Sequence, residues 1–226
     1  YPILEFDENA LDLLCTGIQE TLKHSTLKPA GSAAYRAVKR ILDVVLSTLG
    51  ILFLLIPGLI VAAIIYIEDK GNPIFSHVRL TENGTPFRMY KFRSMGVQDP
   101  KKEAKEWTTK NDVRVTPVGR VIRKTSLDEL PQFWNVLKGD MSLIGPRPER
   151  PLFVEKFKEE IPRYMIKHQV RPGITGWAQV NGFRGDTSIR SRIEHDLYYI
   201  ENWSLGLDIK ILFLTFFKGF VNKNAY

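Results

Sequence analysis

The sequence contains few of the residues that form disulfides and zinc sites. Cys15 is the single cysteine among 226 residues, and there are four histidines. One cysteine cannot form an intrachain disulfide, which excludes a secreted disulfide scaffold. A structural zinc ion needs a cluster of Cys and His ligands, so this composition also argues against a zinc site.

Charge is absent from one long stretch, residues 44–67, which contain 24 consecutive residues without Asp, Glu, Lys or Arg. This length is sufficient for a transmembrane helix, which would measure roughly 36 Å. The stretch is internal and too long for a signal peptide. Pro57 lies near its middle, where it removes one helical hydrogen bond and frees the carbonyl of Phe53, and this favours a kink.

The flanks of this stretch leave two membrane topologies open. Arg36, Lys39 and Arg40 precede it and favour a cytoplasmic N-terminal flank, but the region after it is also basic. If both flanks are cytosolic, the segment must enter one leaflet and return at Pro57, with arms of roughly 18 Å each. The residues favour this re-entrant hairpin, and a true span is the alternative.

The charge balance indicates an anionic partner. The net charge is +7, but residues 1–34 carry −3, so the remainder carries +10. Nucleic acid, a phosphorylated small molecule and acidic lipid headgroups all fit this charge. The charge alone does not choose among them.

Local patterns predict a mixture of strands and helices. Residues 74–80 and 87–92 flank an Asn-Gly turn, which predicts a β-hairpin. Residues 125–138 have helical spacing, with Ser126 and Glu129 as a capping box and Gly139 at the end. Further helices are expected over 148–161, after a cap at Asp186 or Thr187, and over 207–221; residues 99–106 read as a polar loop or short helix. The last helix is either buried or lies in a membrane interface.

The adjacent pair Asp128 and Glu129 is the strongest candidate for chemistry. Such pairs at a helix start are commonly only caps and dipole partners. Here Arg120, Arg123 and Arg147 lie nearby in the sequence. A carboxylate can attack phosphorus covalently if cations or a divalent metal neutralise the phosphate oxygens. Oxygen ligands without a His/Cys cluster favour Mg²⁺.

Further basic residues lie in stiff or glycine-rich contexts. Arg147 stands between two prolines, which would hold it ready for a phosphate, although a surface turn explains the same pattern. Lys91 is expected on the same strand face as Met89, with a solvated strand edge as the plain alternative. Arg171 begins the motif RPGITG, whose backbone allows close approach to a phosphate, although a turn is the alternative. It is not a Walker loop, because the Gly-Lys-Ser/Thr ending is absent.

Four motifs in a fixed order resemble one protein family. They are KFRSM at 91–95, SLDELPQ at 126–132, GPRP at 145–148 and RPGITGW at 171–177. Together with the proline-broken apolar segment they resemble the bacterial sugar transferases. These are the monotopic phosphoglycosyl transferases, also called polyprenyl-phosphate hexose-1-phosphate transferases. The resemblance covers about residues 35–226, and residues 217–226 are similar to the ending of members that start colanic-acid-type and other exopolysaccharides.

The resemblance implies a reaction and a location. Members transfer hexose-1-phosphate from a UDP-sugar to undecaprenyl phosphate and release UMP. They act at the cytoplasmic face of the bacterial inner membrane, in the first membrane step of exopolysaccharide, capsule or O-antigen synthesis. The ending favours glucose-1-phosphate, with galactose-1-phosphate as the alternative. The expected partners are the UDP-sugar, undecaprenyl phosphate and membrane lipids, without nucleic acid; a homo-oligomer is left open.

The resemblance also implies roles for individual residues. Asp128 is the nucleophile of a two-step reaction through a phosphosugar-aspartate, and Glu129 assists it in metal binding or proton handling; both are expected to bind Mg²⁺. Arg123 and Arg147 resemble the phosphate-binding arginines of the family, and Lys91 the lysine of its strand motif. The remaining expected phosphate-binding residues are Arg93, Arg120 and Arg171.

The fold implied by the family is α+β. It has a re-entrant helix-break-helix anchor with its break at Pro57, amphipathic helices at the membrane interface and a small catalytic core containing a β-hairpin. We therefore expect residues 1–34 to be a linker or the tail of an upstream region, 35–68 the membrane anchor and 69–226 the cytoplasmic catalytic domain. Because residue 1 is Tyr rather than Met, we expect the chain to be part of something longer.

Three other interpretations are weaker. A membrane-tethered basic module that binds nucleic acid would fit the charge, but no nucleic-acid motif accompanies it. A glycosidase needs two carboxylates that flank a sugar, and adjacent residues on a helix project in different directions. An inactive homologue would not need the intact motifs.

Overall fold

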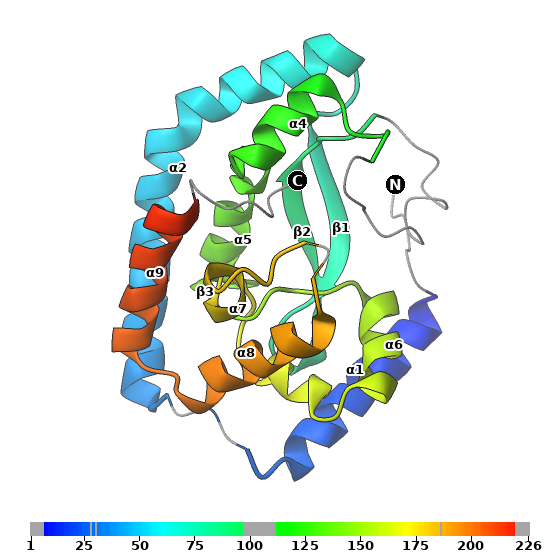
Figure 1. Cartoon of the computed structure of the whole chain (residues 1–226), viewed down its shortest axis with the longest axis vertical. Coiled ribbons are helices and arrows are strands. Elements are labelled where there is room, and N and C mark those ends of the chain that lie inside the picture. Colours follow the sequence, from blue (N-terminus) through cyan, green and yellow to red (C-terminus); the bar gives the residue numbers. More distant parts are fainter. Residues whose placement is uncertain (1–6, 28, 30, 97–111, 186, 220–226) are drawn as a thin grey trace.

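The computed structural model describes residues 7–27, 29, 31–96, 112–185 and 187–219 and has a helix-rich α+β architecture (Figure 1). The helices are α1 (Glu8–His24), α2 (Ala33–Asp69), α4 (Pro117–Lys124), α5 (Gln132–Lys138), α6 (Pro151–Glu160), α7 (Trp177–Val180), α8 (Ile189–Glu201) and α9 (Leu205–Gly219). The strands are β1 (Ile74–Leu80), β2 (Pro86–Phe92), β3 (Ser142–Ile144) and β4 (Gly173–Thr175); short 3₁₀ helices are η1 (Glu82–Gly84), η2 (Leu127–Glu129) and η3 (Tyr164–Gln169). The expected mixed class is confirmed in this coarse form. Residues 99–106, Asp186 and residues 220–226, on which three expectations fall, lie outside the described residues.

The predicted β-hairpin is confirmed. Strands β1 and β2 pair antiparallel, with Ile74 opposite Phe92 and Leu80 opposite Pro86. The turn needs positive φ angles, and Asn83 at +58° and Gly84 at +73° supply them, because Asn and Gly tolerate the left-handed region best. A second, parallel pair joins β3 to β4. The main apolar core lies between these strands and α5, α8 and α9.

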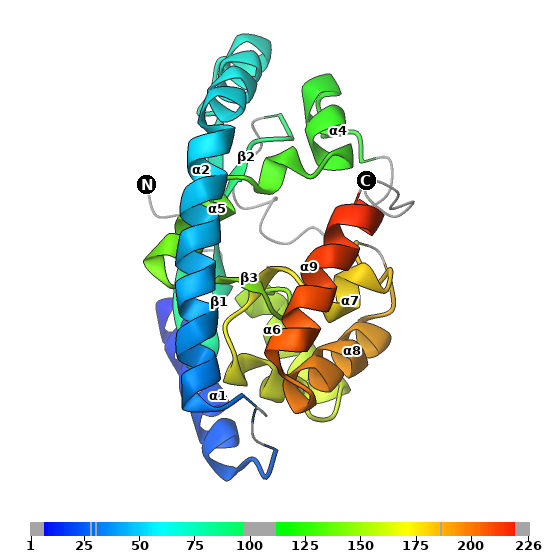
Figure 2. The same cartoon turned by 90° about the vertical axis from the view of Figure 1, so that its left-hand side faces the viewer.

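Helix α2 is long and apolar enough to cross a membrane, and only 6% of its most apolar window is buried. Pro57 lies inside the helix, and Figure 1 shows α2 bending in its upper part. Figure 2 shows α2 covering one side of the molecule, with α9 at its flank. The predicted apolar membrane segment is therefore a single bent helix.

Buried polar contacts hold α2 against the rest of the chain. Lys39 Nζ lies 2.8 Å from Asp208 Oδ2 at the start of α9, and the hydroxyl of Tyr199 donates to Asp208 Oδ1 at 2.7 Å. One turn later, Asp43 Oδ1 accepts from the backbone N–H of Leu143 in β3 at 3.0 Å. Buried charges are stable only when paired in this way. The apolar helix is thus fixed to α9 and to the strand that precedes residues 145–148.

Helix α1 packs onto α6, η3 and α8. Leu14, Ile18 and Leu22 lie at one face at helical spacing and are buried. They belong to an apolar cluster with residues of α6, η3 and α8. A Cβ on Gly84 would lie 3.0 Å from the side chain of Ile18, so the turn of the β-hairpin is closely packed against α1.

The prediction of one capped helix over residues 125–138 is wrong. Ser126 has a φ of +59° and makes no capping hydrogen bond, and it begins the 3₁₀ helix η2. Its hydroxyl accepts a hydrogen bond from Arg184 Nη1 at 3.0 Å instead, so a distant segment replaces the capping box. Helix α5 begins only after Pro131, and it ends at Gly139, as predicted, with a φ of +93°.

The two C-terminal helices follow the predicted order. Helix α8 is capped by Ser188, whose hydroxyl accepts from the N–H of Ser191 at 3.3 Å, rather than by Thr187. In α9, Ile211 is fully buried, but Phe213, Phe216 and Phe217 are each more than half exposed. The interpretation of α9 as a fully buried helix is therefore wrong. The helix is amphipathic in its packing, with an exposed aromatic face.

Helix η3 buries a histidine that destabilises the protein in acid. Burial, assisted by the charge of Lys167, lowers the pKa of His168 to about 3. The unfolded chain binds a proton at this histidine below about pH 6.5, whereas the folded protein does not. The pKa is lower in the folded state, so His168 favours folding above pH 6.5 and loses that contribution as the pH falls.

We expect His168→Gln to reduce the acid sensitivity of folding. Between pH 7.5 and 5.5, the wild type should lose about 1.4 kcal/mol that the variant retains. Thermal unfolding midpoints of both proteins in detergent at the two pH values measure this. His24→Gln, at an exposed position of α1, is the matched control. Equal acid sensitivity in wild type and His168→Gln would contradict the assignment.

Candidate functional site

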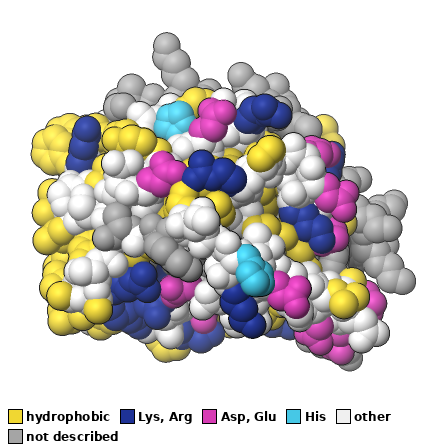
Figure 3. Space-filling model, turned by 90° about the horizontal axis from the view of Figure 1, so that it is seen from below, with side chains coloured by type: hydrophobic (Ala, Val, Ile, Leu, Met, Phe, Trp, Pro, Cys, Tyr) yellow, Lys and Arg dark blue, Asp and Glu magenta, His cyan; other side chains and the backbone are white. Residues whose placement is uncertain are grey.

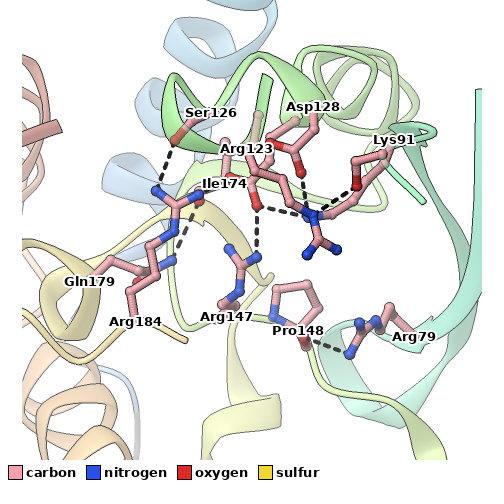
Figure 4. A network of polar contacts seen from close by, with 12 residues as sticks. Arg79, Lys91, Arg123, Ser126, Asp128, Arg147, Pro148, Ile174, Gln179 and Arg184 are labelled. Atoms are coloured by element: carbon pink, nitrogen blue, oxygen red, sulfur yellow. Dashed lines mark hydrogen bonds and ion pairs between the residues drawn. The ribbon is translucent and has the colours of Figure 1, made fainter. Parts of the chain in front are cut away.

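Four segments that are far apart in the sequence meet around η2. The 3₁₀ helix places Asp128 and Glu129 side by side, each only 6% exposed. Lys91 reaches them from β2, Arg147 from the loop after β3, and Arg184 from the loop before α8, as Figure 4 shows. Buried carboxylates with specific charge partners mark a candidate functional site, and arginines in such a site can bind a phosphate with two hydrogen bonds.

Glu129 is held by three cations. Its Oε1 lies 2.7 Å from Arg147 Nη2 and 2.9 Å from Lys91 Nζ, and its Oε2 lies 3.3 Å from Arg184 Nη2. Burial alone would raise the pKa of Glu129. The charges of Arg147, Lys91 and Arg184 outweigh it and hold that pKa well below its ordinary value. Glu129 is therefore ionised and keeps the three cations in place.

Asp128 is much less constrained than Glu129. Its Oδ2 lies 3.4 Å from Lys91 Nζ, and its buried Oδ1 has no hydrogen-bond partner among the described residues. Arg123 lies close enough for the charge of Asp128 to act on its pKa, which burial lowers. Arg123 is itself positioned by its Nε, which donates to Ser94 Oγ at 2.8 Å. An unpartnered carboxylate oxygen beside several cations can attack an electrophilic phosphorus.

The loop that carries Arg147 is supported by tight backbone packing. Gly145 N–H donates to Thr175 O at 2.9 Å, and Gly173 N–H donates to Pro146 O at 2.9 Å. A Cβ on Gly173 would lie 2.1 Å from Gly145 N, and one on Gly176 would lie 2.2 Å from Gly145 O. The glycines of the RPGITG motif therefore allow its backbone to pack directly against the backbone of Gly145. This packing supports the loop that carries Arg147.

The structure brings together only some of the predicted site residues. Lys91, Arg123 and Arg147 gather at Asp128 and Glu129. The other predicted phosphate-binding residues lie elsewhere: Arg93 Nη1 is 3.5 Å from Asp69 Oδ2, Arg171 Nε is 3.5 Å from Glu82 Oε2, and Arg120 is exposed on α4. None of these three arginines makes a contact with Asp128 or Glu129 within the described ranges.

Two further residues near the site stand in no motif of the sequence. Arg184 contacts both Glu129 and Ser126, and only its position between Phe183 and Gly185 marks a loop. His77 on β1 lies on the hairpin face of Lys91, and neither of its ring nitrogens has a hydrogen-bond partner in the part of the chain described. Burial, followed by the charges of Arg79 and Arg150, holds the pKa of His77 well below its ordinary value, so it is neutral.

Arg192 on α8 joins the two loops that supply arginines to Glu129. Its Nη1 donates to Glu149 Oε1 at 3.1 Å, two residues after Arg147. Its Nη2 donates to the carbonyl of Gly185 at 2.7 Å, directly after Arg184. The guanidinium is buried and makes both contacts at once. Arg192 therefore fixes the spacing between Arg147 and Arg184.

The donor set fits Mg²⁺ bound together with a phosphorylated substrate. No group of three or more His, Cys, Asp or Glu that could hold a metal occurs within residues 7–96 and 112–219 as far as they are described. Mg²⁺ commonly uses one or two carboxylates and completes its shell with water and substrate phosphates. Within the described ranges, Asp128 Oδ1 has no hydrogen-bond partner and is available as a ligand atom for this purpose, and Glu129 lies beside it.

Known proteins are similar to this chain over most of its length. The family model for the bacterial sugar transferases matches residues 34–222. The UDP-glucose:undecaprenyl-phosphate glucose-1-phosphate transferase of Escherichia coli K12 is 50% identical over 200 residues, 86% of this chain and 43% of that protein. The protein of the same name from Klebsiella pneumoniae is 50% identical over 193 residues, 83% of this chain and 41% of its own length.

A relative with a different sugar in its name is nearly as similar. The UDP-N-acetylgalactosamine-undecaprenyl-phosphate N-acetylgalactosaminephosphotransferase of Aeromonas hydrophila is 48% identical over 186 residues, 81% of this chain and 44% of that protein. The chain thus spans less than half the length of these three relatives. Sequence identity to these relatives therefore does not distinguish glucose from N-acetylgalactosamine.

Proposed function

The chain belongs to the bacterial sugar transferase family, and from this premise we propose that it transfers a hexose-1-phosphate from a UDP-sugar to undecaprenyl phosphate, releasing UMP. The observation that carries the proposal is the Oδ1 of buried Asp128, which has no hydrogen-bond partner in the described part of the chain and lies amid Lys91, Arg123 and Arg147. A nucleophile surrounded by cations suits attack on a diphosphate.

Asp128 is the nucleophile in this mechanism. Its Oδ1 forms a bond to the β-phosphorus of the UDP-sugar, numbered from uridine, while the bond from that phosphorus to the bridging oxygen breaks. The bridging oxygen leaves on UMP, and the sugar phosphate remains on Asp128. An oxygen of undecaprenyl phosphate then bonds to the same phosphorus, and the bond to Asp128 breaks, which restores the carboxylate.

The cations neutralise charge that develops during both steps. Lys91, Arg147 and Arg184 form a ring around Glu129, so they are already oriented before the substrate arrives. Fixed charges of this kind stabilise a transition state without reorganisation. We propose Mg²⁺ as the cofactor, held by Asp128 and Glu129, and when bound it would supply further positive charge to the diphosphate.

We propose glucose-1-phosphate as the group transferred. The support is that relatives from two bacteria, each 50% identical, carry UDP-glucose and glucose-1-phosphate in their names. Galactose-1-phosphate is the alternative, and the Aeromonas hydrophila relative extends the set to N-acetylgalactosamine. The product would be the first lipid-linked sugar of an exopolysaccharide, capsule or O-antigen.

We propose that α2 is a re-entrant hairpin with its break at Pro57. Both ends of the helix contact the same core: Lys39 pairs with Asp208, and Glu68 Oε1 accepts from the N–H of Val118 at 3.1 Å. A helix that spans a bilayer places its ends on opposite sides of about 30 Å of hydrocarbon. One core that contacts both ends therefore supports a return to the same face.

Cysteine accessibility tests this topology. Cys15 would be replaced by serine, and single cysteines placed at Arg36 and at Lys70, beyond the two ends of the apolar stretch. We expect both to be labelled from the cytoplasmic side of inverted vesicles. Labelling from opposite sides would contradict the hairpin. The same experiment tests the proposed inner-membrane location, with residues 69–226 on the cytoplasmic face.

Nucleotide release tests the reaction. The protein in nanodiscs would be incubated with UDP-glucose, Mg²⁺ and undecaprenyl phosphate, and UMP and UDP quantified separately. We expect UMP, dependent on the lipid phosphate. UDP in its place would mean glycosyl transfer and would overturn the mechanism. UMP from UDP-galactose, but not from UDP-glucose, would favour the alternative sugar.

We expect Arg192→Lys to lower kcat about tenfold while KM for the UDP-sugar changes little. Lysine keeps the charge but cannot contact Glu149 and Gly185 together, so Arg147 and Arg184 lose their fixed spacing. Steady-state UMP release measures the split between kcat and KM. Arg192→Gln should lower kcat further. Arg190→Lys, on the exposed side of α8, is the matched control. A normal kcat in Arg192→Lys would remove Arg192 from the positioning of the site.

A further inference from the structure

A cavity of about 330 Å³ lies at the start of α2, apart from the Asp128 site. Its walls come from the first turns of α2, from η1, β3, the approach to β4 and the end of α8. Asp128, Glu129, Lys91 and Arg147 do not line it. This cavity is where the structure places Arg171.

The lining of the cavity is basic. It includes the cations Arg36, Lys39, Arg40 and Arg171 and the carboxylates Asp43 and Glu82. Lys39 is paired with Asp208, and Arg171 lies 3.5 Å from Glu82.

Arg36 and Arg40 have no carboxylate partner among the described residues. Arg36 lies over the ring of Trp203, at 5.6 Å from its centroid. Arg40 donates to the neutral carbonyls of Val136 and Leu137 at 2.6 and 2.7 Å, which orient the guanidinium but do not neutralise it. Two oriented, uncompensated guanidinium groups at one cavity favour an anion with several oxygen atoms.

The same helical turns expose apolar side chains. Val38, Ile41 and Leu42, which alternate with Arg36 and Arg40 along α2, are between 40% and 62% exposed. The view from below shows Lys and Arg side chains gathered beside a hydrophobic flank (Figure 3). Basic and apolar surfaces therefore meet at the level where the apolar part of α2 begins.

We propose that this cavity binds the phosphate headgroup of an anionic phospholipid. The headgroup phosphate would contact Arg36 and Arg40, and its acyl chains would lie along the exposed apolar face of α2. A free phosphate uses only the basic part of this surface, whereas a lipid uses both parts. Basic pockets beside membrane helices on the cytoplasmic side have this preference for anionic headgroups.

Strand β3 leads from the wall of the cavity to the proposed active site. Ser142 and Ile144 of β3 line it, and the chain continues from β3 directly into the loop that carries Arg147. A bound lipid would thus anchor the strand that supports the site. The inference depends on the membrane placement of α2 and not on sugar transfer, so each proposal can fail without the other.

Native mass spectrometry of the detergent-released full chain tests the proposal. The protein would be titrated with phosphatidylglycerol, with phosphatidylcholine of the same acyl chains, and with inorganic phosphate. We expect phosphatidylglycerol to be retained at least about tenfold more strongly than phosphatidylcholine. The double variant Arg36→Gln/Arg40→Gln should lose that preference. The pair Lys23→Gln/Lys156→Gln, at exposed positions of α1 and α6, is the matched control and should keep it.

Three results would overturn the proposal. They are equal retention of the two lipids by the wild type, an unchanged preference in the double variant, and displacement of phosphatidylglycerol by millimolar inorganic phosphate, which would make the cavity a free-phosphate site. Thermal midpoints measured without added lipid show whether the double variant is folded. If it is not, Arg36→Lys and Arg40→Lys, which keep the charge but not the guanidinium fork, are compared instead, and an undiminished preference in both would contradict the role of the guanidinium groups.

Discussion

Asp128→Asn is expected to abolish UMP release, with a fall of about a thousandfold or more. The amide has the shape of the carboxylate but is not a nucleophile toward phosphorus. Folding should be little affected, because the one ion pair of Asp128 among the described residues is long, at 3.4 Å to Lys91. A thermal unfolding midpoint close to that of the wild type would show that the loss is chemical and not structural.

The covalent step gives this variant a second readout. Wild-type protein incubated with UDP-sugar alone should gain the mass of one sugar phosphate on the peptide that contains Asp128, and Asp128→Asn should gain none. Glu129→Gln distinguishes the role of Glu129 from that of Asp128. It should weaken catalysis, because the cations are misplaced, but it should still allow the adduct to form. Asp12→Asn, on the exposed face of α1, is the control. Near-normal UMP release from Asp128→Asn would refute its role as nucleophile.

Local patterns were sufficient where local interactions decide the structure. The alternation of residues 74–92 around Asn83 and Gly84 predicted the β-hairpin, since the turn itself fixes the register. The uncharged stretch predicted the apolar helix, and Gly139 marked the end of α5 through its positive φ. In each case, the deciding energy comes from residues close together in the chain.

The break before α5 could not be read from the sequence. The apolar spacing of residues 125–138 fits a single helix, but Ser126 adopts a left-handed conformation. Its hydroxyl accepts a hydrogen bond from Arg184, 58 residues away. A tertiary contact therefore overrides the helical pattern. The break directs both Asp128 and Glu129 toward the cations, which a regular helix would not do for adjacent residues.

Tertiary contacts also decide which of the predicted cationic residues reach the site. Lys91 and Arg147 lie in motifs next to fixed backbone, and the structure places both at Glu129. Arg171 belongs to an equally distinctive motif, but the glycines of that motif pack on the Arg147 loop, and its own side chain points to Glu82. Motif membership predicted that these segments meet, whereas only the fold decides which side chain faces the site.

Arg147→Ala should lower kcat about a hundredfold or more. Arg147 lies 2.7 Å from Glu129, and the charge of Glu129 raises the pKa of Arg147, so the guanidinium is charged and held in place. Its loss removes a fixed positive charge from the developing phosphate charge. It also leaves Glu129 with Lys91 and Arg184 alone, which shifts the local balance toward negative charge where an anionic substrate must bind.

Kinetics of UMP release from Arg147→Ala, Arg147→Lys and Arg163→Ala separate the catalytic effect from a structural one. Lysine restores the charge without the planar fork, so Arg147→Lys should fall between alanine and wild type. Arg163 is exposed and pairs with Glu201 far along the chain from η2, so Arg163→Ala should retain normal kcat. If Arg147→Ala changes kcat by less than about threefold, Arg147 serves only to orient Glu129. A large loss that lysine partly recovers, at an unchanged thermal midpoint, would instead place the guanidinium against the phosphate during transfer.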